Sequence, residues 1–357
     1  MLNYLKRIVN FFMKYKFYNT SEKAWKAMYE SVQEAQRLIL LEMYIFLPDT
    51  SPQYNFIEAL ILKAKAGVKV AIIADKMGSQ KMPLTVISKL RKSGVEFLYA
   101  SNLLRRTHRK ILVIDNHTAF LGGVNIKKST SKWNDLQIKI KGKRSIKTIS
   151  RTFAYSYKMY GGKSKEILNL YNKSKLTKVK NIILEHNPHE NISTISAYYR
   201  EKIINAKKTI TIITPYLLPP LWFAVLLDRA VKRGVKVEII IPNKTDLWLV
   251  NFINKSYVKK MSSLGIDVYY YSFMNHAKLM LIDDKEIFMG SHNMDIASFK
   301  LNSEIGIFIQ DKKAISEVKK IISTWKEDSN KIEAEKYKLN WFDFLLMRFI
   351  ALFYSIL

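Results

Sequence analysis

Short apolar runs alternate with segments of helical periodicity along most of the chain. Trp25, Met28, Val32 and Ala35 recur at the spacing of one helix face, and Thr20 is a suitable residue to start that helix. Further helices are predicted over residues 56–66, 84–92, 192–206, 221–232, 247–261 and 316–326. Buried strands are predicted over residues 37–46, 68–74, 95–99, 209–214, 235–241 and 266–271. This alternation predicts an α/β fold, in which helices cover a mixed sheet.

The order of these elements occurs twice. Residues 234–241, GVKVEIII, match residues 67–74, GVKVAIIA, at an offset of 167. A repeat this long predicts two similar lobes, related by a pseudo-twofold axis. The chain then divides into an N-terminal segment (1–18), a first lobe (19–175), a second lobe (176–330) and a C-terminal segment (331–357). The linker falls within residues 161–192.

Both ends of the chain are apolar and basic. In residues 1–17, MLNYLKRIVNFFMKYKF, the polar positions fall in one narrow arc of a helical wheel, and only Lys16 intrudes on the apolar remainder. Residues 341–357, WFDFLLMRFIALFYSIL, give about 25 Å of helix, whereas a bilayer core is about 30 Å thick. Asp343 and Arg348 also argue against spanning. Both ends are predicted to lie in a membrane interface; the alternative is packing on the protein's own core.

The strongest motif is His108–Asn125, HRKILVIDNHTAFLGGVN, which returns as His276–Asn293, HAKLMLIDDKEIFMGSHN. Each copy has His-x-Lys, an Asp and a final Gly-[Gly/Ser]-x-Asn, and every key position repeats at an offset of 168. His and Lys share one face of a strand because they are two residues apart. The Asp begins a turn, and a second strand brings the Asn back toward the His-Lys end. Imidazole, ammonium and carboxamide groups beside small residues at Gly123 and Ser291 fit a phosphate oxyanion.

The amino-acid composition limits the kinds of partner and site that the protein can have. The 357 residues include 59 Lys and Arg against 30 Asp and Glu, for a net charge of +29. Such a charge attracts nucleic acid or an anionic membrane surface, although a generally lysine-rich proteome is an alternative explanation. The absence of cysteine excludes disulfides, thiolate metal sites and Cys nucleophiles. His117, His186, His189 and His292 lack partners at metal-ligand spacing and are expected to be loop or shell residues.

The duplicated His-Lys-Asp motif resembles the signature of the phospholipase D superfamily, and within it the chain is most similar to bacterial cardiolipin synthases. Residues 41–46 (LEMYIF), 133–135 (WND), 214–216 (TPY) and 302–304 (NSE) also fit. The resemblance covers roughly residues 35 to 325. It implies two phospholipase D-like lobes with the active site between them. The chain departs from the family's pattern in lacking its usual pair of N-terminal transmembrane helices.

The resemblance also implies residue roles. His108 is the implied nucleophile, which forms a phosphohistidine, and His276 is the implied acid and then base; the residues alone leave this order open. The rest of the implied catalytic set is Lys110, Asp115, Lys278 and Asp283, of which the two aspartates hold the turn of the motif. No metal and no cofactor is implied.

Other side chains are implied to support this set. Asn125 and Asn293 join the two lysines in binding the nonbridging phosphate oxygens, next to Gly123 and Ser291. Asp135 and Glu304 lie 27 and 28 residues after the two histidines. The resemblance implies that each carboxylate orients the histidine of the other lobe. Tyr44 and Tyr216 are expected to line the site.

The function predicted is cardiolipin synthesis, in which two phosphatidylglycerol molecules give cardiolipin and glycerol. The partners are then an anionic phospholipid and the membrane surface. The protein is expected to be a peripheral or monotopic bacterial membrane protein, with the cytoplasmic face favoured. Phosphatidylethanolamine as the second lipid and the oligomeric state are left open.

Other functions fit parts of the sequence. Attack by water in place of the second lipid would make the protein a phospholipase D. A superfamily nuclease would also use the positive charge, but the apolar ends favour lipid, so nucleic acid is not an expected partner. Two complete motifs disfavour a non-catalytic membrane adaptor.

Overall fold

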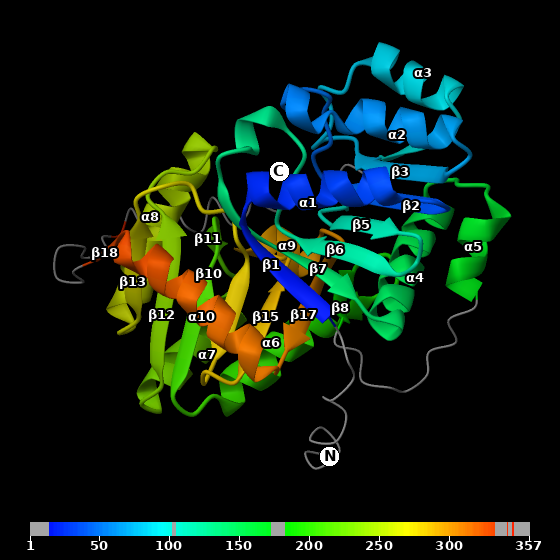
Figure 1. Ribbon diagram of the computed structural model, residues 1–357. Helices are drawn as coiled ribbons and strands as arrows, with labels where there is room; N and C mark the ends of the chain where they lie inside the picture. The colour runs from blue at the N-terminus through cyan, green and yellow to red at the C-terminus, as the bar shows by residue number, and fades with distance from the viewer. Residues whose placement is uncertain (1–13, 102–104, 173–182, 333–340, 342–344, 346–357) are drawn as a thin grey trace. The chain divides into compact units, whose positions relative to one another are not determined.

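The computed structural model describes residues 14–101, 105–172, 183–332, 341 and 345. The chain forms two compact units, Met1–Ile183 and Leu184–Leu357. Each unit contains a mixed β-sheet flanked by helices (Figure 1), which confirms the predicted α/β fold with two similar lobes. The predicted boundary between residues 175 and 176 lies outside the described residues.

The sheet of the first unit has seven strands in the order β1–β7–β6–β5–β2–β3–β4. Strands β2, β3 and β4 are parallel, and the other neighbouring strands pair antiparallel. The strands are β1 Lys14–Thr20, β2 Leu38–Met43, β3 Lys69–Asp75, β4 Glu96–Ala100, β5 Lys110–Ile114, β6 Thr118–Gly122 and β7 Asn134–Lys141. The helices are α1 Ser21–Glu34, α2 Phe56–Lys65, α3 Leu84–Lys92, α4 Lys143–Met159 and α5 Lys165–Asn172, with short 3-10 turns at Pro52–Tyr54 and Lys128–Thr130.

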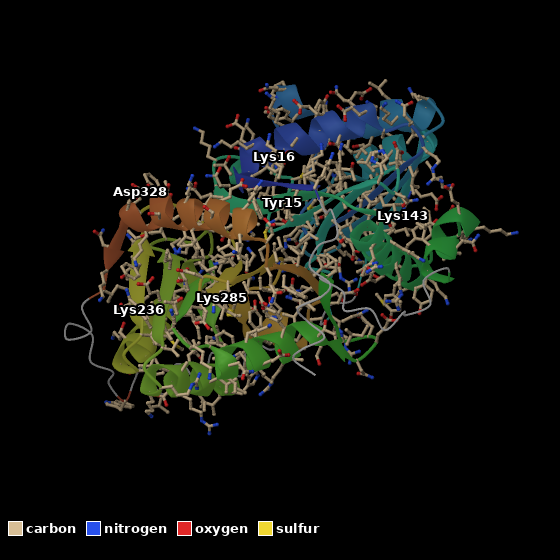
Figure 2. All side chains as sticks on the ribbon, turned by 60° about the horizontal axis from the view of Figure 1, so that its bottom comes forward. Tyr15, Lys16, Lys143, Lys236, Lys285 and Asp328 are labelled. Atoms are coloured by element: carbon tan, nitrogen blue, oxygen red, sulfur yellow. The ribbon has the colours of Figure 1, made fainter. Side chains whose placement is uncertain are left out.

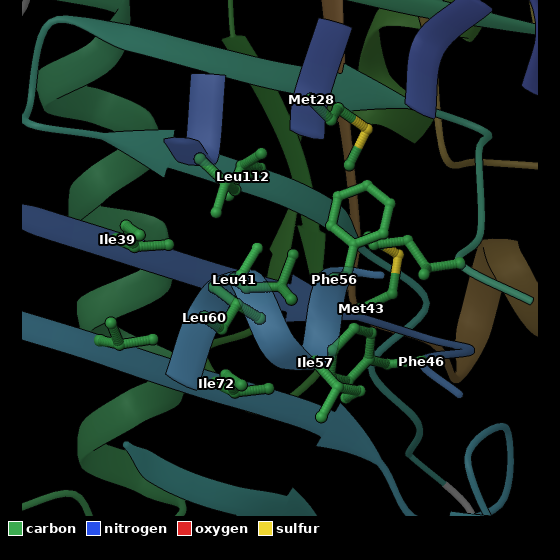
Figure 3. Close-up of a cluster of buried hydrophobic side chains, with 14 of the residues drawn as sticks. Met28, Ile39, Leu41, Met43, Phe46, Phe56, Ile57, Leu60, Ile72 and Leu112 are labelled. Atoms are coloured by element: carbon green, nitrogen blue, oxygen red, sulfur yellow. The ribbon is translucent and has the colours of Figure 1, made fainter. Parts of the chain in front are cut away.

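Alternate side chains of the central strands face opposite sides of this sheet. Leu41 of β2 packs in one buried cluster with Met28 of α1 and Leu60 of α2 (Figure 3). The next residue, Glu42, points to the other side, where its carboxylate accepts a hydrogen bond from Ser156 of α4. The face of β2 that carries Glu42 therefore packs against α4, so the Glu42 carboxylate lies inside the unit.

The second unit repeats this arrangement. Its sheet has the order β18–β13–β12–β10–β14–β15–β17–β8–β9. Across this sheet, the strands β8–β17–β15–β14–β10–β12–β13 match β1–β7–β6–β5–β2–β3–β4 of the first unit. This match confirms the predicted internal repeat. The strands are β8 Ile183–Asn187, β9 Ile192–Ser193, β10 Thr209–Ile213, β12 Lys236–Pro242, β13 Asp267–Tyr271, β14 Leu279–Ile282, β15 Glu286–Gly290, β17 Glu304–Ile309 and β18 Ser329–Lys331. A separate two-stranded sheet pairs β11 Leu217–Leu218 with β16 Met294–Asp295. The helices are α6 Thr194–Asn205, α7 Leu221–Lys232, α8 Trp248–Ser263, α9 Ile296–Lys300 and α10 Lys312–Glu327.

The helix ends follow from local sequence. Thr20 caps α1 by accepting a hydrogen bond from the backbone N–H of Lys23 at 3.3 Å. Gly67 and Gly234, which open the two GVKV segments, have φ of 87° and 82°. This left-handed conformation ends α2 and α7 and turns the chain into the next strand, and glycine adopts it without steric cost.

Residues 14–18 correct the prediction of an N-terminal helix over residues 1–18. They belong to β1, which pairs antiparallel with β7 and places Phe17 opposite Ile138. Lys14 and Lys16 are exposed, whereas Phe17 is buried (Figure 2 labels Lys16). This alternation has the period of a strand, and pairing supplies the backbone partners that β7 would otherwise lack along this edge. Residues 1–13 lie outside the described residues.

The C-terminal segment was predicted to begin at residue 331. Lys331 instead ends β18, which pairs with β13, and Ile332 is buried in the core of the second unit. Apart from Trp341 and Leu345, the predicted apolar segment over 341–357 lies outside the described residues. Within the described part of the chain, no helix has the length and apolar character needed to cross a membrane.

Candidate active site

Each His-x-Lys motif forms a β-hairpin, as predicted. Strand β5 pairs with β6, and β14 pairs with β15. The hairpin turns contain Asp115-Asn116 and Asp283-Asp284, with φ between 52° and 55°. Positive φ at both central residues is the requirement of a type I′ turn, for which Asp and Asn are favoured. Each hairpin therefore returns its final Asn toward the end of the strand that carries His and Lys.

In the first unit, His108 and Lys110 are held close together and are nearly inaccessible to solvent. The Lys110 ammonium donates a hydrogen bond to the backbone carbonyl of His108 at 2.7 Å. Its Nζ also lies 5.1 Å from the centre of the Tyr44 ring. The same ring meets the His108 imidazole edge-on, with centroids 4.7 Å apart. Tyr44 therefore lines this half-site, as expected.

Asn125, which follows β6, is buried and held by two hydrogen bonds. Its side-chain oxygen accepts a hydrogen bond from the backbone N–H of Ile45, the neighbour of Tyr44, at 3.2 Å. Its backbone carbonyl accepts one from the indole N–H of Trp25 at 2.8 Å. Trp25 is a core residue of α1, so the packing of this helix helps to fix the position of the Asn125 backbone after the hairpin.

Asp135 lies against Gly123 in the first unit. A Cβ atom at position 123 would come 2.1 Å from the Asp135 carboxylate, so no other residue fits there without displacing it. Asp135 is 1% exposed, and its Oδ1 accepts a hydrogen bond from its neighbour Leu136 at 2.7 Å. The Gly that the sequence placed near a phosphate thus also leaves room for a buried carboxylate.

The second unit repeats the central pair. Lys278 donates a hydrogen bond to the backbone carbonyl of His276, and both side chains are buried. Tyr216 faces His276 with ring centroids 6.3 Å apart, so it lines this half-site as Tyr44 lines the other. The Tyr216 hydroxyl in turn donates to the Asp246 carboxylate at 2.9 Å.

Glu304 occupies in the second unit the place of Asp135 in the first. Ser291, the counterpart of Gly123, donates a hydrogen bond from its hydroxyl to the Glu304 carboxylate. The other carboxylate oxygen accepts from Ser298 of α9 at 2.8 Å, and the backbone N–H of Asn293 donates to the same Ser298 hydroxyl at 3.2 Å. The buried carboxylate and the final Asn of the motif are thus joined through one serine.

Asp295 adds a second acid to this network. It caps α9 by accepting from the Ser298 N–H at 2.7 Å. Burial raises the pKa of Asp295 to about 6; the Ser298 N–H opposes this rise, and the nearby charge of Glu304 adds to it. The two buried carboxylates lie close to each other, so the charge of Glu304 favours the protonated form of Asp295 as the pH falls toward 6.

Asp115 and Asp283 lie at the other end of their strands from the histidines. Asp115 accepts hydrogen bonds from the backbone N–H groups of residues 36, 37 and 38 at 2.8–2.9 Å. Asp283 does the same with residues 207, 208 and 209. They are positioning residues, which fix the start of β2 and β10 against the hairpin, and the structure does not place them among the groups around the histidines. In the second unit, Lys236 and Lys285 mark this turn end of the sheet (Figure 2).

The sequence interpretation missed a buried ionic network in the first unit. Arg109, between His108 and Lys110, faces α4 and is 1% exposed. Its Nη1 lies 3.8 Å from Oε1 of the fully buried Glu42 and donates to Ser156 at 2.9 Å. The same Oε1 accepts from the Thr107 hydroxyl at 2.5 Å. Both neighbours of His108 are therefore anchored to Glu42.

This network distinguishes the two half-sites. The residues at the matching positions of the second unit are Ala277 and Ile213, which are buried and apolar. The signal in the sequence was a Glu within the apolar strand LILLEM and an Arg within the motif. Charged residues on the inner face of a strand need a partner, but the sequence does not show which residue it is.

Of the remaining histidines, His117 and His189 lie in turns, as expected, and His186 is a buried residue of β8. His292 is fully buried and meets the Phe299 ring with centroids 4.4 Å apart. His117 lies in the first hairpin turn, with a side chain that is 65% exposed. No group of three or more His, Asp or Glu side chains within the described ranges is arranged to hold a metal ion.

A duplicated α/β unit that places His, Lys and Asn together at one end of each motif hairpin defines a class of proteins suited to phosphodiester chemistry. A family profile described as "Cardiolipin synthase, PLD-like domain" matches residues 28–157 and 199–325 of this chain. The chain belongs to this phospholipase D-like family.

Curated relatives agree with this assignment. The chain is 30% identical over 323 residues to the probable cardiolipin synthase YwiE of Bacillus subtilis (strain 168), covering 84% of this chain and 63% of the relative. It is 30% identical over 346 residues to the major cardiolipin synthase ClsA of the same organism, covering 88% of this chain and 69% of the relative. The chain thus spans about two thirds of the length of these relatives.

Solved structures show the same fold. The phosphatidylserine synthase of Haemophilus influenzae Rd KW20 superposes with a TM-score of 0.73 at 14% identity, over 96% of this chain and 94% of that one. The polyphosphate kinase of Porphyromonas gingivalis gives a TM-score of 0.64 at 14% identity, over 95% of this chain and 52% of that one. At these identities the likeness concerns the fold alone.

Proposed function

We propose that this chain is a phosphatidyltransferase that forms cardiolipin and glycerol from two phosphatidylglycerol molecules. The observation that carries the proposal is the duplicated half-site, in which a buried His-x-Lys pair and a buried Asn occupy the same end of matched hairpins. Membership of the cardiolipin synthase-type family supports the choice of a phospholipid as the phosphodiester. The proposal requires the pseudo-twofold relation predicted from the repeat, so that both half-sites reach one phosphorus atom.

In the first step, an imidazole nitrogen of His108 attacks the phosphorus of one phosphatidylglycerol. A P–N bond forms, the P–O bond to the headgroup glycerol breaks, and protonated His276 gives its proton to the departing oxygen. Splitting the exchange in this way replaces one difficult displacement by two easier ones. Two nearby imidazoles resist carrying a charge together, so a single proton serves both roles.

In the second step, a glycerol hydroxyl of the other phosphatidylglycerol gives its proton to His276. Its oxygen forms a new P–O bond while the P–N bond to His108 breaks, which regenerates both side chains. Anchoring of Thr107 and Arg109 to Glu42 favours His108 as the nucleophile, because the chain on both sides of this histidine is held in place.

The supporting groups follow the same logic. Lys110 and Lys278 neutralise the nonbridging oxygens, with Asn125 and Asn293 as hydrogen-bond donors. Asp135 and Glu304 are proposed to hold the tautomers of the histidines, each acting on the histidine of the other unit. Gly123 and Ser291 are proposed to lie next to the phosphate, and their own contacts are with the carboxylates of Asp135 and Glu304.

The proposed setting is the surface of a bacterial cell membrane, on the cytoplasmic face, with the protein bound peripherally or as a monotopic protein. A net charge of +29 favours an anionic lipid such as phosphatidylglycerol. The proposal leaves nucleic acid without a role, and DNA cleavage is therefore one of the results that would contradict it.

Lipid products test the proposal. The purified chain, incubated with phosphatidylglycerol in detergent and in vesicles with a metal chelator present, should release glycerol and a four-chain lipid in equal amounts. His108→Ala and His276→Ala should each lower the rate by about 10³-fold or more. His117→Ala, in the exposed turn, is the matched control and should keep nearly full activity.

Three results would contradict the proposal. Phosphatidic acid as the only product would make the protein a hydrolase. Cleavage of single-stranded DNA without any lipid product would favour a nuclease. Retention of a tenth of the rate by either His→Ala variant, at matched folding, would exclude the two-histidine mechanism.

A further inference from the structure

The start of α8 exposes a group of large apolar side chains. Leu247 is 48% exposed, Trp248 81% and Phe252 44%. Trp248 and Phe252 are four residues apart and so lie on the same face of the helix. Lys255, also exposed, continues this face, and Lys244 is exposed just before the helix. Aromatic side chains followed by lysines form the pattern of a surface that enters a membrane interface.

This group is attached to the second half-site. Asp246, next to Leu247, accepts the hydrogen bond of the Tyr216 hydroxyl, and Tyr216 faces His276. Asn254 of α8 bonds to the chain on both sides of Tyr216, to the Pro215 carbonyl and from the Leu217 N–H, each at 2.9 Å. The exposed apolar group is therefore held at the edge of the half-site.

The loop before α8 is held by hydrogen bonds within the loop and to the helix. The backbone N–H of Thr245 donates to the Asn251 side chain at 2.6 Å, and the Thr245 hydroxyl donates to the Leu247 carbonyl at 3.0 Å. These hydrogen bonds hold Leu247 and Trp248 exposed to solvent. Contact of such large apolar side chains with water is unfavourable, so a group of them marks an interaction surface.

The first unit has a matching arrangement. Leu84, the first residue of α3 as Trp248 is of α8, is 80% exposed, and Met77 is 38% exposed. The loop between them is tied to the half-site, because Ser79 donates from its hydroxyl to the Tyr44 carbonyl at 3.0 Å. Lys76 and Lys81, in the same loop, are exposed.

We propose that these two groups, the first rim (Met77 and Leu84) and the second rim (Leu247, Trp248 and Phe252), dock on an anionic phospholipid bilayer. The apolar side chains enter the boundary between headgroups and acyl chains, and the flanking lysines meet lipid phosphates. Each rim then brings its own half-site to the lipid headgroups. The inference rests on the proposed function in taking lipid as substrate, and it adds the surface through which the body of the protein meets the membrane.

Nucleic acid fits the rims poorly. Its phosphates would meet the lysines, but the sugar-phosphate backbone offers nothing to desolvate Leu84, Leu247 or Phe252. Both rims also lie in the part of the chain that the structure describes, so docking through them is distinct from the attachment expected of the chain's ends.

The chain has no cysteine, so one introduced thiol can be labelled alone. We would place the environment-sensitive fluorophore NBD on Trp248→Cys and, separately, on Leu84→Cys, in a His108→Ala background that prevents turnover. Leu62→Cys and Ile204→Cys are matched controls, because these side chains are 58% and 52% exposed and lie toward the turn end of their sheets.

With vesicles of phosphatidylglycerol and phosphatidylcholine, the label at 248 and at 84 should gain about threefold in emission and be quenched by brominated acyl chains. The control labels should change much less. A label at 248 that responds no more than the controls would overturn the proposal. So would an emission gain that follows protein concentration without lipid, since a second copy of the chain would then cover the surface.

A second measurement separates this inference from the proposed function. The triple variant Leu247→Ser/Trp248→Ser/Phe252→Ser should need about tenfold more vesicle lipid for half-maximal binding, whereas Leu62→Ser/Ile204→Ser should bind as the parent does. Formation of lipid product in detergent, without an emission gain at 248 or 84 on vesicles, would contradict the docking proposal but not the proposed function. Rim insertion without any lipid product would contradict the proposed function and leave the rims standing.

Discussion

At the scale of single residues, the motif aspartates have the clearest task. Partial burial opposes ionisation of Asp115, but three backbone N–H donors outweigh it and hold the pKa of this carboxyl below its usual range. The pKa of Asp283 is lowered in the same way. A lowered pKa in the folded state means that ionisation stabilises the fold. The stabilisation is complete above the unfolded pKa of about 4 and is lost as pH falls through the lower folded value.

Asp115→Asn should therefore lower the free energy of unfolding by about 1–3 kcal/mol at pH 7, because an amide replaces the ionised acceptor of three N–H groups. The deficit relative to the parent should shrink as the pH falls below about 4. Urea denaturation of the parent and the variant at several pH values measures this deficit in the free energy of unfolding. Asp284→Asn, at the half-exposed second position of the other hairpin turn, is the control and should stay within about 0.5 kcal/mol. An Asp115→Asn deficit independent of pH would contradict this account.

The residues that could be predicted were those whose chemistry repeats. His108, Lys110 and Asn125 and their counterparts were recognisable because three polar types recur at one offset around apolar strands. The pairing of Gly123 with Asp135 and of Ser291 with Glu304 was not predictable as a contact, because it depends on the register between β6 or β15 and the next strand. The partnership of Arg109 with Glu42 likewise depends on α4, which the sequence interpretation did not identify.

At the scale of elements, the network under β5 makes a prediction. Arg109→Ala leaves the buried Glu42 without its cation and should lower the free energy of unfolding by about 3–5 kcal/mol. The double variant Arg109→Met/Glu42→Leu removes both charges and should recover most of this loss, since apolar groups of similar size replace the pair. Denaturation of the parent, single and double variants measures both effects. Equal losses in the single and double variants would show that the charges do not interact.

Helices α3 and α7 begin and end where the sequence indicated, at Leu84–Lys92 and Leu221–Lys232. In both, a proline precedes the first turn and a glycine follows the last, so local sequence decides the limits. Strand β7 and helix α4 were missed although their patterns were present: Leu136, Ile138 and Ile140 alternate, and Ile146, Ile149 and Phe153 fall on one helix face. Strand β1 was assigned to a helix because its short alternation lay beside a longer helical pattern.

At the scale of the whole molecule, the repeat predicted the order of elements in both units, because two copies of one pattern constrain each other. It could not predict β8, which lies in the segment taken as linker, or the edge strand β9, which covers the first two residues of the helix predicted over 192–206. The repeat also leaves the two histidines almost equivalent. The half-sites differ most in the Glu42 network, which joins Arg109 of the first motif to Glu42 of β2, whereas the matching residues of the second unit are apolar. In the proposed mechanism this difference favours a covalent intermediate on the first unit.

Detection of that phosphatidyl-histidine intermediate is the most direct test of the proposed mechanism. Phosphatidyl-p-nitrophenol has a leaving group that needs no proton, so His276→Ala should release one p-nitrophenol per chain and then stall. Mass spectrometry of the digested protein should find a phosphatidyl group on the peptide that contains His108. His108→Ala should show neither the burst nor the adduct. An adduct on His276 in His108→Ala would reverse the two roles, and turnover by the parent without an adduct in either variant would contradict covalent catalysis by histidine.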